Sequence, residues 1–198
     1  MIHVGLTGGM GGGKSTVSKL FELLEVPIYN SDIQARIIME NNADVKSRII
    51  SLLGEESYIV SKLNRKFIAS RIFDSESLRK AINSIVHPEV LIDYEAWSSK
   101  FSVPYVIKES ALILDTIRFQ KVDQIVMVFS PLLLRMKRIQ ERDNITKHEA
   151  SQRIAQQRPD KEILEVADYV IVNDEHHPLI PQVLNVHQEF LNFAIEKE

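Results

Sequence analysis

Residues 8–15 form a glycine-rich pattern that strongly limits what this chain can fold into. They read Gly-Gly-Met-Gly-Gly-Gly-Lys-Ser and match G-x-x-x-x-G-K-[ST], the phosphate-binding loop, or P-loop. This motif requires a buried strand before it and a helix after it. The sequence supplies both. Before the motif a short apolar run suits a buried strand (Ile2, Val4 and Leu6), and after it apolar residues fall at helical spacing (Val17, Leu20, Phe21 and Leu24). The sequence therefore predicts a strand–loop–helix unit built around a phosphate site.

The composition of the loop explains its chemistry. Five glycines among residues 8–13 allow backbone conformations that side chains forbid. Backbone N–H groups can then converge on a phosphate at a helix N-terminus, which carries a partial positive charge. In such a loop Lys14 reaches the β- and γ-phosphates, and the Ser15 hydroxyl binds Mg²⁺. A glycine-rich turn without a ligand is the alternative, and the joint presence of strand, complete motif and helix argues against it.

The composition of the whole chain excludes several other classes of protein. With 198 residues, 44% of them hydrophobic and 26% charged, the chain can bury a core in one domain with an embedded subdomain or in two small domains. A net charge of −3 does not indicate a nucleic-acid surface, and no apolar run approaches the length of a membrane span. The absence of cysteine and of a signal-peptide pattern agrees with a cytoplasmic protein.

Strand and helix patterns alternate along the rest of the chain. This alternation predicts an α/β fold with a parallel, doubly wound sheet flanked by helices. After the first strand, four more are expected at residues 26–29, 105–108, 124–129 and 169–172. Residues 33–100 read as a helical insertion, in which His87-Pro88 breaks one helix and starts another. Ser130-Pro131 reads as a helix N-cap followed by the first helical position.

Two acidic residues follow the ends of predicted strands, where ligands bind in open α/β sheets. Asp32 is a candidate functional residue, and the alternative is a helix N-cap, for which Ser31 and Asp32 both qualify. Glu109 is a candidate for the second acidic residue near Mg²⁺, either directly or through a water molecule. An ordinary strand-end carboxylate is the alternative for Glu109, for which we favour the functional interpretation. Position alone leaves the question open for Asp32.

Basic residues are concentrated between residues 132 and 158. Arg135, Arg138 and Arg142 have the spacing of one helical face. Thr146 and Glu149 have capping-box spacing, so a second helix is predicted to begin there. A charged, solvated helix is the usual meaning of such a run. Beside a P-loop we interpret it as a mobile lid whose arginines close over the nucleotide.

Further motifs resemble one family along the length of the chain. GLTGGMGGGKSTV, residues 5–17, is similar to the opening GLTGG-x-GSGKSTV of the dephospho-coenzyme A kinases. The other similar stretches are Leu63-Asn64-Arg65 with Ile72-Phe73, Ile85-Val86-His87-Pro88, Lys137-Arg138 with Arg142-Asp143, and Gln157 with Ala167-Asp168 and Val170-Ile171-Val172-Asn173. The P-loop alone indicates only nucleotide binding, whereas the combination is much more specific.

The resemblance implies an enzyme that uses ATP to phosphorylate the ribose 3′-hydroxyl of dephospho-CoA. The products are CoA and ADP, in the last step of coenzyme A biosynthesis, with Mg²⁺ as cofactor. The implied organisation is a P-loop kinase core at 1–32, 101–134 and 159–198, a helical CoA-binding domain at 33–100 and a lid at 135–158. ATP and dephospho-CoA are the expected partners of a monomer or small homo-oligomer, with neither nucleic acid nor membrane.

The same resemblance implies roles for individual residues. Asp32 is matched to the catalytic base, Asn173 lies near the expected adenine pocket, and Arg138 and Arg142 match lid arginines. The full expected set is Gly9, Gly11, Gly12, Gly13, Lys14, Ser15, Thr16, Arg138 and Asn173 for ATP; Asp32, Arg65 and His87 for dephospho-CoA; Ser15 and Glu109 for the metal; and Asp32, Lys14, Arg138 and Arg142 for catalysis.

Three departures from the family pattern stand out. Asn30 replaces the first aspartate of a D-A-D motif, Ala111–Asp115 replaces PLLFE, and Asp174-Glu175 stands where a glycine often follows the asparagine. None removes the P-loop, the matched base or the lid arginines. Two rival functions stay open: another small-molecule kinase on the same core, and a nucleotide-dependent switch or regulatory ATPase. The long insertion favours a bulky acceptor over the first, and the arginine lid argues against the second.

Overall fold

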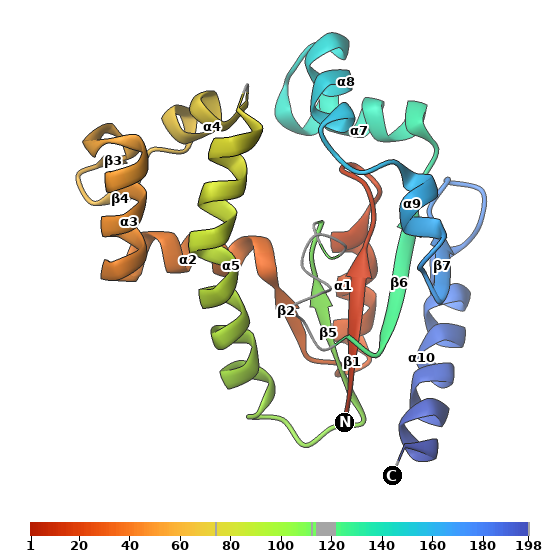
Figure 1. The fold of residues 1–198 in the computed structure, drawn as a ribbon. Helices are drawn as coiled ribbons and strands as arrows, with labels where there is room; N and C mark the ends of the chain where they lie inside the picture. Colours follow the sequence, from red (N-terminus) through yellow and green to blue (C-terminus); the bar gives the residue numbers. More distant parts are fainter. Residues whose placement is uncertain (74, 112, 114–121, 198) are drawn as a thin grey trace. The chain divides into compact units, whose positions relative to one another are not determined.

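The computed structural model describes residues 1–73, 75–111, 113 and 122–197. It divides into two compact units, one made of Met1–Tyr29 with Phe101–Glu198 and the other of Asn30–Lys100 (Figure 1). The first unit contains a five-stranded sheet in the order β2-β5-β1-β6-β7. The predicted five-stranded parallel sheet with flanking helices is therefore confirmed.

The strand that leads into the P-loop lies at the centre of this sheet. β1 (Ile2–Thr7) pairs in parallel with β5 (Tyr105–Glu109) on one side and with β6 (Gln124–Phe129) on the other. β6 pairs in parallel with β7 (Tyr169–Val172), and β2 (Ile28–Asn30) lies at the opposite edge. Parallel strands end at the same edge of a sheet, so the segments after β1, β5, β6 and β7 meet there.

Two helices cover one face of the sheet and form the core of the first unit. α1 (Lys14–Leu23) packs with α10 (Leu179–Glu196), and Phe21 and Phe190 are fully buried beside Leu6. The remaining described helices of this unit are α7 (Leu132–Asp143), α8 (Lys147–Ala155) and α9 (Asp160–Leu164). The predicted capping box at the start of α8 is confirmed, since the Thr146 and Glu149 side chains each bond the other's backbone.

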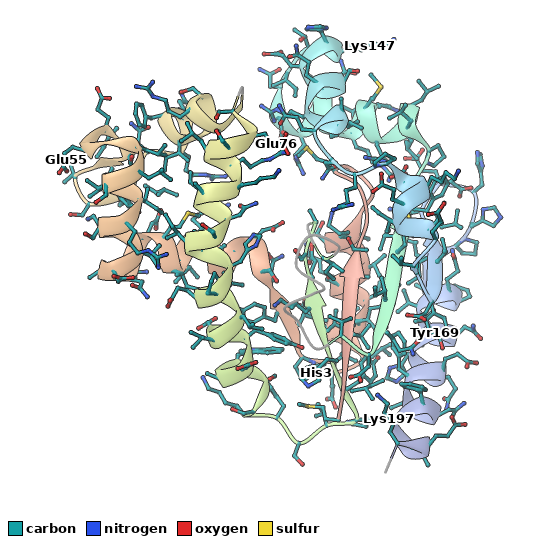
Figure 2. All side chains as sticks on the ribbon, in the orientation of Figure 1. His3, Glu55, Glu76, Lys147, Tyr169 and Lys197 are labelled. Carbon is teal, nitrogen blue, oxygen red and sulfur yellow. The ribbon has the colours of Figure 1, made fainter. Side chains whose placement is uncertain are left out.

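The amino ends of the strands are closed by polar contacts at the chain termini. Asp123 accepts the backbone N–H of His3 at 2.7 Å and the Lys197 ammonium at 2.5 Å. Figure 2 shows His3, at the start of β1, and Lys197, after α10, at the same end of this unit. With that end occupied by structural contacts, the carboxyl edge of the sheet is where a ligand site can form.

The second unit is helical, as expected for the insertion. It contains α2 (Ser31–Asn41), α3 (Ala43–Leu53), the short 3₁₀ helix η1 (Glu55–Ser57), α4 (Arg65–Phe73) and α5 (Glu76–Ser98). It also holds a small hairpin that the sequence did not predict, formed by β3 (Tyr58–Ile59) and β4 (Lys62–Leu63). Val60 and Ser61 turn this hairpin with φ of 47° and 67°, a left-handed conformation more typical of glycine or asparagine.

Two predicted helix boundaries are wrong. His87-Pro88 does not divide the long helix, because α5 runs through Pro88 without interruption. Proline removes one N–H from the helix, but Ile82, Ile85 and Val90 on both sides of it are buried and hold the helix together. Ser130 does not cap α7, because Pro131 occupies the N-cap position and the Ser130 hydroxyl bonds elsewhere. No helix in the described part of the chain is long and apolar enough to cross a membrane.

Candidate active site

The P-loop joins β1 to α1 and takes the conformation that its glycines permit. Gly8, Gly11 and Gly13 have φ of 144°, 75° and 95°, which side-chain-bearing residues rarely adopt. The loop closes on itself, with the Gly12 N–H donating to the Gly9 carbonyl at 3.0 Å. The Lys14 ammonium donates to the Gly8 carbonyl at 2.8 Å, so this cation lies against the loop. A compact cradle with an adjacent ammonium group suits a phosphate.

The first turn of α1 adds to this anion site. Gly13 is the N-cap and supplies no side chain to cap the helix, and the first turn contains no acidic residue. The N–H groups at a helix start need acceptors, and the helix dipole favours negative charge there. Ser15 and Thr16 are exposed in this turn, which agrees with their predicted contact to the nucleotide. The arrangement can therefore bind a polyphosphate through backbone N–H groups, Lys14 and hydroxyls.

Side chains from the neighbouring strand ends hold the outer wall of the loop. Asn173, directly after β7, donates from Nδ2 to the Gly12 carbonyl at 2.9 Å. Arg138 of α7 donates to the Asn173 Oδ1 at 3.3 Å, to the Ser130 hydroxyl at 3.1 Å and to the Gly11 carbonyl at 3.4 Å. Arg138 and Asn173, two of the predicted ATP-binding residues, thus lie beside the P-loop, where these hydrogen bonds join them to the protein itself. Their predicted roles toward ATP stay predictions.

The basic helix α7 differs from the expectation of one uniform lid face. The exposed fraction of the side chain rises along the helix, from 4% at Arg135 through 25% at Arg138 to 60% at Arg142. The start of α7 is packed against the P-loop, and its end extends past the loop. Arg135 is therefore buried rather than presented as a lid arginine, whereas Arg142 remains a candidate for that role.

The exposed end of α7 carries a cluster of opposite charges. Arg142 donates from Nε and NH2 to the two carboxylate oxygens of Asp143, at 2.7 and 3.0 Å. Arg153 of α8 donates to the same carboxylate at 2.7 Å. The hydrogen bond from Arg142 lowers the pKa of Asp143 and raises that of Arg142. Asp143 thus joins α7 to α8 and holds two arginines that could instead face phosphate oxygens.

The candidate metal ligands occupy the first turns of α1 and the end of β5. Glu109 is 8% exposed and accepts the Ser18 hydroxyl at 2.8 Å. Ser18 lies one helical turn after Ser15, the other predicted metal ligand. The described residues contain no group of three or more His, Cys, Asp and Glu side chains arranged for a metal ion. Hydroxyl and carboxylate oxygens suit Mg²⁺, which usually enters kinase sites with phosphates and water rather than in a protein cage.

The predicted acceptor-binding residues lie in the second unit. Asn30 caps α2, since its side chain accepts the Ile33 N–H at 3.0 Å, so the alternative that Ser31 or Asp32 is the cap is wrong. Asp32 is exposed in the first turn of α2 and does not cap that helix. Asn30 performs the capping that an aspartate could also perform, which explains this departure from the D-A-D pattern locally.

Two other predicted contacts to dephospho-CoA are also in this unit. Arg65 is exposed at the start of α4, and His87 is half-buried within α5. Their roles stay predictions. Leu112, Leu114 and Asp115, in the departure from PLLFE, lie outside the described residues. The predicted lid boundaries at 135–158 also stay a prediction.

Sequence reasoning gave no site role to several residues that shape this site. The Ser130 hydroxyl donates to the Asn173 carbonyl at 2.7 Å, and Gln157 accepts the Met10 N–H at 2.6 Å. Asp160 pairs with the buried Arg135 at 2.8 Å. Ser130 could have been found from its position after β6, at the ligand edge of the sheet. Asp168, part of the family pattern, contacts β6 instead. Its backbone N–H donates to the Ile125 carbonyl, and its carboxylate accepts the Ile125 N–H.

Comparisons with known proteins agree with this geometry. The family model described as dephospho-CoA kinase matches residues 2–178. A protein of Bacteroides fragilis named dephospho-CoA kinase is 39% identical over 197 residues, which span 99% of this chain and 94% of the relative. The crystal structure of TT1252 from Thermus thermophilus has a TM-score of 0.85 at 26% identity, covering 96% of this chain and 97% of that one.

A second solved structure shares the fold at lower identity. It is a dephospho-CoA kinase from Campylobacter jejuni, with a TM-score of 0.58 at 22% identity, covering 95% of this chain and 96% of that one. The family match, the relative that aligns over nearly the whole chain and the P-loop architecture lead to one assignment. This chain belongs to the dephospho-CoA kinase family.

Proposed function

We propose that this chain transfers the γ-phosphoryl group of ATP to the ribose 3′-hydroxyl of dephospho-CoA, giving CoA and ADP. The observation that supports it most is the P-loop, closed on itself with Lys14 against it, in a chain of this family. The P-loop supports the nucleotide half of the reaction. The acceptor half is supported by family membership and by a helical unit, residues 30–100, that a small phosphate acceptor does not require.

Transfer proceeds by direct, in-line attack of the 3′-hydroxyl on the γ-phosphorus. The loop N–H groups and Lys14 bind the β- and γ-phosphates and stabilise the charge that develops on the transferring oxygens. Asp32 orients the 3′-hydroxyl and accepts its proton, a role that typically contributes about 10²–10⁴-fold. Arg138 and Arg142 add positive charge over the nucleotide, and closure of the exposed part of the predicted lid, beyond the buried Arg135, excludes water that would otherwise hydrolyse ATP.

Ser15 and Glu109 are the residues that would hold Mg²⁺, directly or through water. Both offer oxygen atoms, and Glu109 is fixed in place by the Ser18 hydroxyl. Bound there with the nucleotide, Mg²⁺ would neutralise part of the charge of the phosphates. A cytoplasmic location is part of the proposal because both ATP and the acceptor are soluble metabolites. A monomer or small homo-oligomer is sufficient for this chemistry.

The test of the reaction is product formation from a panel of acceptors. The purified chain is incubated with ATP and Mg²⁺ together with dephospho-CoA, AMP, CMP or no acceptor, and ADP and CoA are measured. We expect ADP release that depends on dephospho-CoA and equals CoA formed. Turnover with AMP or CMP alone would favour another small-molecule kinase, and hydrolysis indifferent to every acceptor would favour a switch or ATPase.

The test of the catalytic base compares two aspartates at the same helical position. Asp32 is the second residue of α2, and Asp44 is the second residue of α3; both are exposed. Asp32→Asn should retain ATP binding and lose about 10²–10⁴-fold in kcat, because proton acceptance is lost. Asp44→Asn should leave kcat unchanged. Near-normal turnover of Asp32→Asn would remove Asp32 from the role of base.

A further inference from the structure

Arg135 is buried to a degree that is unusual for an arginine. Its side chain is 4% exposed and lies in the first turn of α7. Its NH1 group donates to both carboxylate oxygens of Asp160, at 2.8 Å each, and its Nε donates to the Met10 carbonyl at 2.9 Å. A guanidinium group that is buried in this way needs a charged partner, and Asp160, the first residue of α9, supplies it.

The same contacts hold both backbone groups of one P-loop residue. Arg135 bonds the carbonyl of Met10, and the Gln157 side chain accepts the Met10 N–H at 2.6 Å. The loop backbone also lies directly against the guanidinium group. A Cβ on Gly9 would lie 2.1 Å from the Arg135 NH2 atom, so the glycine at this position is required by the arginine beside it.

Holding Met10 from outside fixes the direction of the next N–H group. In a trans peptide the carbonyl of one residue and the N–H of the next point in opposite directions, and the described backbone has no cis peptide. The Met10 carbonyl points to Arg135, so the Gly11 N–H points the other way, toward the interior of the loop. That interior is where the nucleotide phosphates bind if the proposed function is correct.

We propose that Arg135 and Asp160 are positioning residues that pre-organise the P-loop for the ATP phosphates, acting through Met10 and without touching the nucleotide. This inference rests on the proposed nucleotide binding and goes beyond it. Asp160 neutralises Arg135 and holds its NH1 group, while the Met10 carbonyl holds its Nε, which explains why this arginine does not act as a lid arginine. Pre-organisation favours binding because the loop need not be ordered when the ligand arrives.

The decisive variant is the double substitution Arg135→Met/Asp160→Leu. Replacing a buried ion pair by apolar residues of similar volume is often neutral or stabilising for the fold, so the chain should remain folded. The hold on the Met10 carbonyl is nevertheless lost. We expect a rise of about 10- to 100-fold in the Kd for a non-hydrolysable ATP analogue with Mg²⁺, the range implied by losing one hydrogen bond from a charged donor. The KM for dephospho-CoA should not change.

A second measurement separates positioning from a merely structural role. Hydrogen exchange of the amides of residues 10–13, without nucleotide, should become faster in the double variant while exchange in α10 stays unchanged. The matched control is Arg48→Met/Asp44→Leu, which removes an exposed arginine–carboxylate pair of 3.5 Å within α3. This control should leave both nucleotide affinity and loop exchange unchanged.

The outcomes distinguish this proposal from the proposed function. A folded double variant with unchanged analogue affinity and unchanged loop exchange would overturn the positioning role. If the double variant does not fold, Arg135→Lys replaces it. Lysine keeps a positive charge beside Asp160 but lacks the Nε–H that bonds the Met10 carbonyl, so unchanged analogue affinity there would also overturn the proposal. A chain that binds the analogue but never phosphorylates dephospho-CoA would refute the proposed reaction and leave the positioning role standing.

Discussion

Gly13→Ala should destabilise the chain by about 2.5 to 4.5 kcal/mol, because Asn173 occupies the space that the new methyl group needs. Gly13 has a φ of 95°, a left-handed conformation that costs an L-residue about 1–2 kcal/mol. An ideal Cβ there would lie 1.9 Å from Asn173 Nδ2, so Asn173 must move. It would lose its bond to the Gly12 carbonyl, about 0.5–1.5 kcal/mol, and its bond from Arg138, about 1 kcal/mol at the length of 3.3 Å.

The assay is a double-mutant cycle on the free energy of unfolding in urea. Asn173→Ala alone should lower that free energy by about 1.5–2.5 kcal/mol, because it removes the same two hydrogen bonds. In the Asn173→Ala background Gly13→Ala should cost only the backbone strain of about 1–2 kcal/mol. The two substitutions should therefore couple by about 1.5–2.5 kcal/mol, with the double variant about as stable as Gly13→Ala.

Gly54 supplies the control for backbone strain without a contact. It has a φ of 97°, and a Cβ there would meet nothing within 4 Å. Gly54→Ala should destabilise the chain through strain alone, by about 1–3 kcal/mol, and should add to Asn173→Ala without coupling. The reasoning is refuted if Gly13→Ala and Asn173→Ala are additive within about 0.5 kcal/mol, since Asn173 would then not restrict the residue at position 13.

Two further predictions concern stability. Pro88→Ala should raise the free energy of unfolding by about 1–3 kcal/mol, because it restores an N–H that can bond the Ser84 carbonyl. Position 88 is exposed in α5, so the smaller side chain leaves no cavity, and an unchanged or lower urea midpoint would contradict this prediction. Burial lowers the pKa of His187, whose Nδ1 shares a hydrogen bond of 2.6 Å with the Tyr105 hydroxyl. The folded chain therefore binds fewer protons there than the unfolded chain below about pH 6.5. Stability should therefore fall from pH 7 to pH 5 more steeply in the wild-type chain than in His187→Gln, and parallel pH curves would exclude this contribution.

The elements set by local signals could be predicted from the sequence. The apolar runs of β6 and β7 gave strands at 124–129 and 169–172, and both bounds agree with the structure. The P-loop motif located the turn between β1 and α1 because its glycines are needed where the backbone has positive φ. The Thr146–Glu149 capping box located the start of α8 because both of its bonds are local.

Features that depend on tertiary contacts could not be predicted in this way. The spacing of Arg135, Arg138 and Arg142 places them on one helical face but does not say how far that face is buried along its length. Arg135 meets Met10 across 125 positions of sequence, and no local pattern encodes that contact. Pro88 ends a helix by local rules, yet buried residues on both sides of it keep α5 continuous. Val60 and Ser61 turn a hairpin with residues that turn statistics disfavour.

The P-loop carbonyls explain why residues implied in ATP binding contact the protein instead. Arg135, Arg138 and Asn173 donate to the carbonyls of Met10, Gly11 and Gly12, from outside the loop. A loop whose N–H groups face a phosphate must turn carbonyls outward, and buried carbonyls need donors. Arginine side chains of α7 and the asparagine directly after β7 meet that need. Their side chains therefore matter for nucleotide binding even where they never reach the nucleotide, and substitution of any of the three is expected to act on the loop first.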